Sequence, residues 1–126
     1  MGFILQIEKT SSTPYIFIDE DNGYMQFQGE SFHENVISFY QDVSNWIEHY
    51  LDTDFTKFTF DCELKYFNSS TAKFLLNILI ELDEYAVAGK EIVVNWITTA
   101  DNAIIIECYE DFEEEIEDLA FNLIIR

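Results

Sequence analysis

The sequence predicts an α/β fold in which a mixed central sheet begins with an N-terminal hairpin and carries its helices mainly on one face. Strand-like and helix-like patterns alternate after Gly29, a turn signal at Asp21-Asn22-Gly23 joins two strand-like segments before it, and 48% of the 126 residues are hydrophobic. Alternating strands and helices favour right-handed crossovers between parallel strands. A chain of this length and composition builds one core, so we expect residues 1–126 to form a single domain.

The N-terminal part reads as β-structure. Residues 3–7 are a short candidate strand, and Tyr15-Ile16-Phe17-Ile18 is rich in β-forming side chains. Tyr24-Met25-Gln26-Phe27-Gln28 alternates apolar and polar residues, which is typical of a strand with one buried face. The Asn-Gly turn between the last two segments predicts an antiparallel hairpin that ends at Gly29.

A helix is predicted from Ser31 to about Leu51. Ser31 followed by Glu34 has the spacing of a capping box, in which the two side chains satisfy the free N–H groups of a helix start. The apolar residues are then spaced by three and four: Val36, Tyr40, Val43, Ile47 and Tyr50. Phe39 and Trp46 lie on another side of this helix, as flanks of the core or as a binding patch.

The second half continues the alternation. Residues 55–62 read as a strand, and a helix follows from about Ser70 to Ala88, where Gly89 is a good C-terminal stop. Its buried stripe is expected at Leu75, Leu76, Leu79, Leu82 and Ala86. A nearly continuous apolar strand (92–97), a third helix (101–112) and an edge strand (120–125) complete the chain.

Charge and composition exclude several function classes. The chain has 25 acidic and 6 basic residues, a formal net charge of -19. Binding to nucleic acid needs cationic side chains that displace counterions from phosphates, so neither nucleic acid nor an anionic membrane is expected as a partner. The acidity either attracts a partner with a basic face or only keeps the protein soluble.

Signals for export or membrane insertion are also missing from the sequence. Cys62 and Cys108 lie in apolar stretches and are predicted to be free, buried thiols in a reducing compartment. The N-terminus lacks a signal-peptide pattern, and no apolar run of about 18 residues could span a membrane. We therefore expect a cytoplasmic protein.

Residues that could carry catalysis are scarce. The two histidines, His33 and His49, are expected near helix ends, and no nucleophile elbow or glycine-rich phosphate loop is present. The stretch from Glu107 to Asp118 holds eight acidic side chains but lacks the alternating ligands and central glycine of a calcium-binding loop. We interpret it as a solvated helical face or a docking surface, and expect no metal, no cofactor and no enzymatic activity.

Asn68-Ser69-Ser70-Thr71 is the segment with a specific chemical use. All four side chains can cap a helix, and three of them are hydroxyls. A phosphate added here would meet free backbone N–H groups and the positive end of the helix dipole. From the residues alone, the segment is either a simple helix cap or an acceptor of phosphate.

Three blocks of the sequence resemble one family in combination. They are residues 29–35 (GESFHEN), residues 64–73 (LKYFNSSTAK), and Gly89-Lys90 before the strand that reaches Trp96. With them the chain resembles the SiaC-type regulatory phosphoproteins over roughly residues 10 to 115. The family has a STAS-like fold, related to that of anti-sigma-factor antagonists. The chain departs from the family pattern at His33, where proline is common, and in its acidic tail after Phe112.

The resemblance implies a phosphorylation-controlled partner switch. A serine/threonine kinase modifies a hydroxyl in the Tyr-x-Asn-Ser/Thr-Ser block, a metal-dependent phosphatase removes the phosphate, and the unphosphorylated form binds and activates a diguanylate cyclase, which favours biofilm formation. The acceptor falls on Ser69, with Ser70 and Thr71 as alternatives. The expected contact surface comprises Tyr66, Phe67, Asn68 and Ser70.

Two other functions remain open from the sequence. The chain could be a constitutive acidic adaptor, or an antagonist-like binding module with a different output partner. It could also be a small enzyme or metal binder that uses the acidic stretch, although the missing ligand pattern argues against this.

Overall fold

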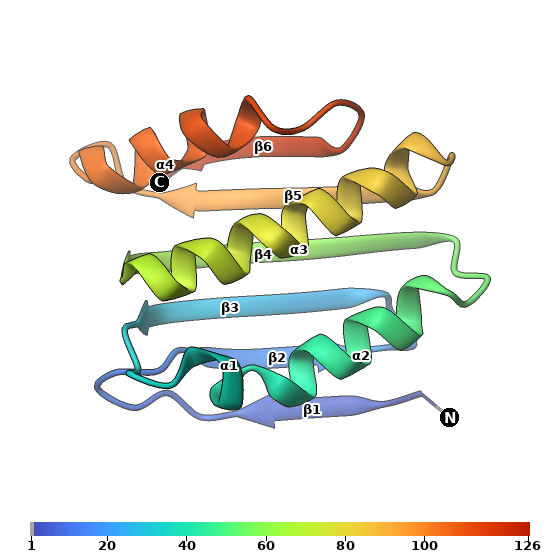
Figure 1. Cartoon of the computed structure of the whole chain (residues 1–126), viewed down its shortest axis with the longest axis horizontal. Helices are drawn as coiled ribbons and strands as arrows, with labels where there is room; N and C mark the ends of the chain where they lie inside the picture. Colours follow the sequence, from blue (N-terminus) through green and yellow to red (C-terminus); the bar gives the residue numbers. More distant parts are fainter. Residues whose placement is uncertain (1) are drawn as a thin grey trace.

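The computed structural model describes residues 2–126 and contains one six-stranded mixed sheet (Figure 1). The strands lie side by side in chain order: β1 (Ile4–Ile7), β2 (Tyr15–Asp19), β3 (Tyr24–Ser31), β4 (Lys57–Phe67), β5 (Glu91–Thr98) and β6 (Ala120–Ile125). β1, β2 and β3 pair antiparallel, whereas β3 to β6 pair parallel. The predicted N-terminal hairpin and parallel pairing are both confirmed.

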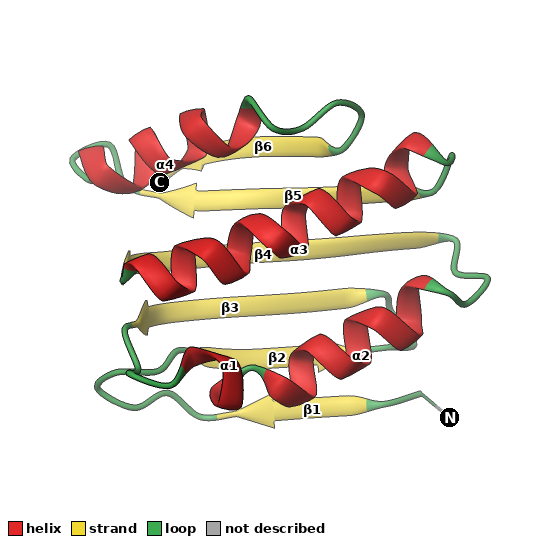
Figure 2. Ribbon diagram, viewed as in Figure 1, coloured by secondary structure: helices red, strands yellow, loops and turns green. Residues whose placement is uncertain are grey.

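The helices all cover the same face of this sheet (Figure 2). They are α1 (Val36–Phe39), α2 (Gln41–Leu51), α3 (Ser69–Val87) and α4 (Ala103–Glu113). When parallel strands follow one another in order and every crossover has the same hand, the connecting helices must fall on one side. The fold class predicted from the sequence is thus confirmed, and none of the helices formed by residues 2–126 lies on the other face of the sheet. Within residues 2–126, none of the helices has the length and apolarity needed to cross a bilayer.

The hairpin turn depends on Gly23. Its φ angle is +58°, in the left-handed region that favours glycine, and a Cβ added there would lie 2.2 Å from the carbonyl oxygen of Lys57. The same backbone accepts the N–H of Thr59 at 2.8 Å, which ties the hairpin to the start of β4. The Asp-Asn-Gly signal therefore fixes both the turn and the placement of the next strand.

The helix predicted from Ser31 is wrong at its start. β3 continues through Ser31, which pairs with Phe67 at the end of β4, and Asn35 caps α1 by accepting the N–H of Ser38 at 3.2 Å. Tyr40 then separates α1 from α2. The capping-box spacing is a local signal, and long-range strand pairing together with burial of the Ser31 side chain overrides it.

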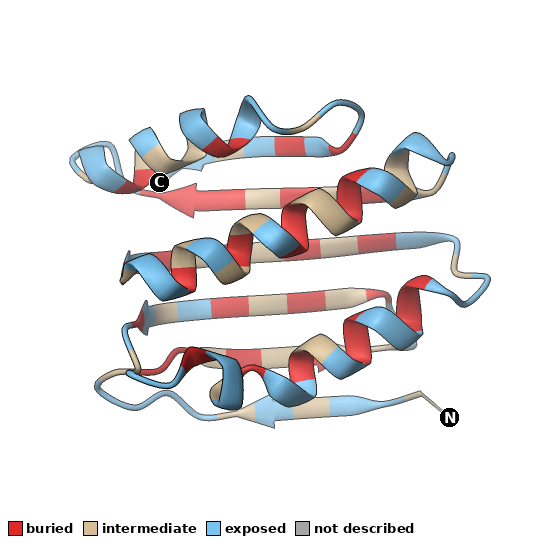
Figure 3. Ribbon diagram, in the orientation of Figure 1, coloured by how far each residue is buried: buried red, intermediate tan, exposed pale blue. Residues whose placement is uncertain are grey.

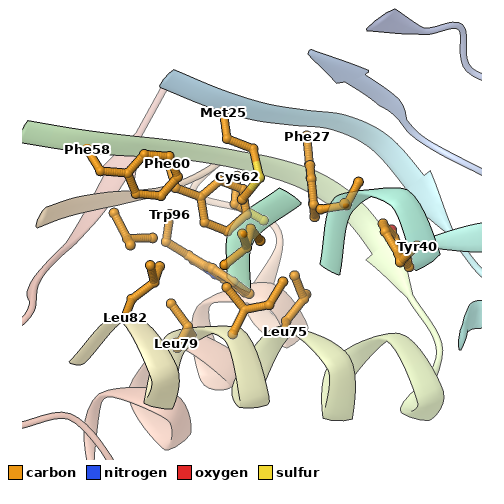
Figure 4. Packing of buried hydrophobic residues seen from close by; sticks show 14 of the residues in the cluster. Met25, Phe27, Tyr40, Phe58, Phe60, Cys62, Leu75, Leu79, Leu82 and Trp96 are labelled. Atoms are coloured by element: carbon orange, nitrogen blue, oxygen red, sulfur yellow. The ribbon is translucent and has the colours of Figure 1, made fainter. Parts of the chain in front are cut away.

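The apolar core lies between the sheet and the helices. Alternate residues of β2 to β5 are buried (Figure 3). Figure 4 shows Trp96 between the sheet and Leu75, Leu79 and Leu82 of α3. Phe27 packs edge-to-face against Phe60 and stacks on Tyr40. Trp46, which the sequence left as either core or binding patch, is buried, and its Nε1–H donates to Glu20 at 2.9 Å. Cys62 is a buried free thiol as predicted, whereas Cys108 is only half-buried.

The helix-free face carries a row of bonded polar side chains. Asp61 accepts hydrogen bonds from the Tyr24 hydroxyl and from the Asn95 side-chain amide, both at 2.8 Å, and Asn122 donates to Asn95 at 3.3 Å. These residues cross β3, β4, β5 and β6. These hydrogen bonds link the four strands to one another on this face.

Candidate functional site

Ser69 is the first residue of α3 and is exposed to solvent. Asn68 is the N-cap: its backbone is extended, with φ -85° and ψ 175°, and its Oδ1 accepts the N–H of Thr71 at 2.9 Å. The N–H groups of a first helical turn have no partner within the helix, so they point out past this end. Ser69 therefore lies where the positive end of the helix meets solvent, beside the ends of β3 and β4 (Figure 1).

The three hydroxyls of this segment differ in exposure. Ser70 is exposed like Ser69, but Thr71 is 0% exposed. Thr71 cannot serve as an alternative acceptor while the chain is folded, because a kinase could not reach its hydroxyl. Of the four residues that could cap the helix, Asn68 supplies the cap, and Ser70 and Thr71 do not.

Thr71 instead belongs to a buried hydroxyl network beneath Ser69. Its Oγ1 donates to the carbonyl oxygen of Ser31 at 3.0 Å and lies 2.9 Å from the Ser31 hydroxyl, which in turn lies 2.7 Å from the hydroxyl of Tyr40. Burial raises the pKa of Tyr40, so its hydroxyl stays protonated at neutral pH. These hydrogen bonds connect the first turn of α3 to the end of β3 and to Tyr40 at the junction of α1 with α2.

Thr71→Val is expected to lower the free energy of unfolding by about 1–2 kcal/mol, because the variant keeps the shape of the side chain but removes a buried donor. The carbonyl of Ser31 keeps one bond, from the N–H of Asn68 at 3.1 Å, which limits the loss. Urea unfolding followed by circular dichroism measures the effect. Ser70→Ala is the matched control and should change stability by less than about 0.5 kcal/mol; equal effects of the two variants would refute the network's role.

Two lysines flank Ser69 at equal distances along the chain. Lys65 precedes it by four residues and Lys73 follows it by four, and both side chains are exposed. Residues four apart on a helix are neighbours, and an anion placed N-terminal to a lysine is the favourable order. A phosphate on Ser69 would therefore lie within reach of Lys73, in a chain that has only 6 basic residues.

Exposed apolar side chains surround the same end of the molecule. Tyr66 is 48% exposed and packs edge-to-face on Phe32, with ring centroids 5.8 Å apart. Ile37 on α1 is 80% exposed. The register of β3 against β4 shifts between Gly29 and Glu30, so that Lys65 is an extra residue bulged out just before Tyr66. The aromatic pair therefore lies at the end of β4 that leads into α3, with Tyr66 three residues before Ser69 in the chain.

Phe67 does not belong to this exposed surface. It is buried and packs edge-to-face against Trp96, with ring centroids 5.9 Å apart. The expectation that it contacts a partner is wrong, because the bulge before Tyr66 turns the next side chain into the core. Asn68 is half-buried and occupied with capping, so Tyr66 and Ser70 are the exposed members of the expected contact set.

The acidic stretch falls on α4 and the loop before β6. Within the part of the chain that the structure describes, no group of three or more His, Cys, Asp or Glu side chains is arranged to hold a metal ion. The loop is anchored instead by Asp83 of α3, which accepts the N–H groups of Glu117, Asp118 and Leu119 at 2.9–3.1 Å. Sequence patterning missed this residue, because Asp83 lies between Glu81 and Glu84 and nothing in the local sequence distinguishes it from these exposed or half-buried carboxylates.

Comparisons with known proteins bear on the whole chain. A family model described as "SiaC family regulatory phosphoprotein" matches residues 7–126. An uncharacterised protein of Pseudomonas aeruginosa, strain UCBPP-PA14, is 32% identical over 111 residues, which are 88% of each chain.

Solved structures of similar fold come from the same organism. SiaC of Pseudomonas aeruginosa superposes with a TM-score of 0.86 at 29% identity, covering 99% of this chain and 98% of that one. A chain in the crystal structure of the diguanylate cyclase SiaD in complex with its activator SiaC superposes with a TM-score of 0.89 at 30% identity, covering 97% of this chain and 99% of that one. The structural similarity therefore extends over almost the full length of both superposed chains in each case.

Proposed function

This chain belongs to the SiaC family of regulatory phosphoproteins, and from that premise we propose that it is a phosphorylation-controlled partner switch. In its unphosphorylated form it binds and activates a diguanylate cyclase, and so influences cyclic-di-GMP signalling and biofilm formation. Support comes from the similar structure of a SiaC that is named the activator of the diguanylate cyclase SiaD. The protein works in the cytoplasm by binding, without catalysis of its own.

The exposed position of Ser69 carries the proposal. Ser69 is the first residue of α3 and is exposed to solvent, whereas Thr71, two residues later, is fully buried. A kinase can reach such a hydroxyl without unfolding the helix, and a phosphatase can reach the resulting phosphate. The helix end and Lys73 would both favour the added negative charge, so modification leaves the fold intact.

The same phosphate would change what a partner meets. It adds about -1.5 to -2 charges at neutral pH. The exposed apolar side chains of Phe32, Ile37 and Tyr66, at the end of the molecule where α3 begins, provide area that a partner would bury. A phosphate at such a contact must lose its hydration shell when the partner binds. Desolvating this charged group costs more free energy than desolvating the neutral hydroxyl of Ser69.

Ser69→Asp is expected to weaken binding to the diguanylate cyclase partner by tenfold or more, whereas Ser69→Ala should bind like the wild type. Isothermal titration calorimetry measures the affinities, and cyclase assays with and without each variant measure activation. If both variants bind and activate like the wild type, the proposed switch fails. Phosphopeptide mass spectrometry of protein from its native cells adds a second check, since a Ser69 that stays unmodified in all growth states would indicate a constitutive adaptor.

A further inference from the structure

A groove runs along α3 on the helical side of the molecule. Its first part, a hollow of about 370 Å³ between α1 and α3, begins at Ser70 and Lys73. Its second part, about 400 Å³ between α2 and α3, ends at Glu81 and Glu84. Phe74 and Asn77 line both hollows, so the two lie next to each other along α3 and together form the groove. Figure 1 shows α1 and α2 on one side of this line and α3 on the other.

The groove has the length and lining of a helix-binding site. The segment of α3 from Ser70 to Glu84 spans about 21 Å at a rise of 1.5 Å per residue, which matches a partner helix of about four turns. Phe74, Ile78 and Ile80 provide an apolar floor. An amphipathic helix that lies in a groove inserts side chains spaced by three and four residues into such a floor.

The charges along the groove show which kind of helix fits. At the far end, Glu48 of α2 faces Glu81 and Glu84 of α3, with no lysine or arginine among the lining residues of that hollow. Partial burial and the neighbouring carboxylates Glu48, Glu84 and Asp52 raise the pKa of Glu81. The carboxylates repel one another in the free protein, and a cation brought between them would relieve that repulsion. The end at Ser70 has the opposite sign, because Lys73 lies there.

We propose that this groove binds an amphipathic helix of the cyclase partner, with lysine or arginine side chains of that helix paired with Glu48, Glu81 and Glu84. This inference rests on the proposed function and adds the surface and the chemistry of the contact. It also relates the switch to the contact, because Ser70 lines the first hollow and Ser69 precedes it in the chain. A phosphate there would pair with Lys73 and occupy the end where the partner helix enters.

The test compares the double variant Glu81→Lys/Glu84→Lys with the matched variant Glu8→Lys/Asp21→Lys, which makes the same charge change at exposed carboxylates outside the groove and outside the acidic stretch. Calorimetric titration with the cyclase at fixed low salt should show a loss of affinity of about tenfold or more for the groove variant, and a loss of less than about threefold for the control. Thermal unfolding should show that the groove variant is at least as stable as the wild type, because it relieves the repulsion among the carboxylates.

A second pair of variants tests the shape of the groove without changing charge. Asn77→Trp fills the junction of the two hollows and should weaken cyclase binding by tenfold or more, while Asn122→Trp on the helix-free face should not. If each groove variant binds like its control, the groove is not the contact surface, although the switch at Ser69 can still hold. If wild-type protein does not bind the cyclase at all, the proposed function fails and this inference fails with it.

Discussion

Trp96→Ala is expected to lower the free energy of unfolding by about 4 kcal/mol. Trp96 is 2% exposed and contacts three aromatic rings edge-to-face, those of Phe67, Phe112 and Phe121, with ring centroids 5.6–5.9 Å apart. Its indole N–H also donates to the carbonyl oxygen of Ile105 at 3.0 Å. Alanine would leave a large cavity between β5 and α4 and would remove the hydrogen bond from the indole to α4.

Equilibrium unfolding in urea, followed by far-ultraviolet circular dichroism, measures this loss. Ile104→Ala, at a side chain that is 68% exposed on the same helix that Trp96 contacts, is the control and should change stability by less than about 0.5 kcal/mol. A loss below about 1 kcal/mol for Trp96→Ala would contradict the packing described here. Phe67 packs against Trp96 and immediately precedes Asn68, the N-cap of α3. A Trp96→Phe variant that folds should therefore also have a less ordered first turn of α3.

Asp83→Ala is expected to cost about 3 kcal/mol, because it leaves the three N–H groups of the α4–β6 loop without their acceptor. The Asp83 side chain is buried, and both of its oxygens accept from that loop. Glu84→Ala removes an exposed carboxylate from the next position of the same helix and should be nearly neutral. Equal costs for the two variants would show that the loop does not depend on Asp83.

The contribution of Asp83 depends on pH in a defined direction. Burial acts to raise the pKa of this carboxyl, but the hydrogen bonds from Leu119, Asp118 and Glu117 outweigh it and hold the pKa below its ordinary value. A carboxyl with a lowered folded-state pKa stabilises the fold above its unfolded-state pKa of about 4, and this contribution is lost as pH falls through the folded-state value. The stability difference between the wild type and Asp83→Ala should therefore be constant near neutral pH and shrink below about pH 4.

Local signals predicted most of the fold. The hairpin followed from an Asn-Gly turn between two alternating segments, and α3 followed from a capping residue, a buried stripe and a terminal glycine, to within one residue at each end. β5 followed from an apolar run. In each of these cases the residues that decide the structure are close together in the sequence, so their pattern is sufficient.

The sequence was misleading where distant residues decide the structure. Ser31 has the spacing of a helix cap, but a hydroxyl 40 positions away holds it at the end of a strand. Phe67 lies in the predicted contact block, yet a bulge and the ring of Trp96 turn it into the core. The groove along α3 could not be predicted at all, because its walls come from two crossovers whose packing no local pattern encodes.

Phosphorylated protein provides the most direct test of the central proposal. Protein carrying one phosphate on Ser69, verified by intact mass and fragment spectra, would be titrated into the cyclase beside the same preparation after phosphatase treatment. The proposal predicts that the phosphorylated form binds at least tenfold more weakly and does not activate the cyclase, and that phosphatase treatment restores both. Equal affinity and equal activation by the two forms would contradict the proposal that phosphorylation of Ser69 controls this protein.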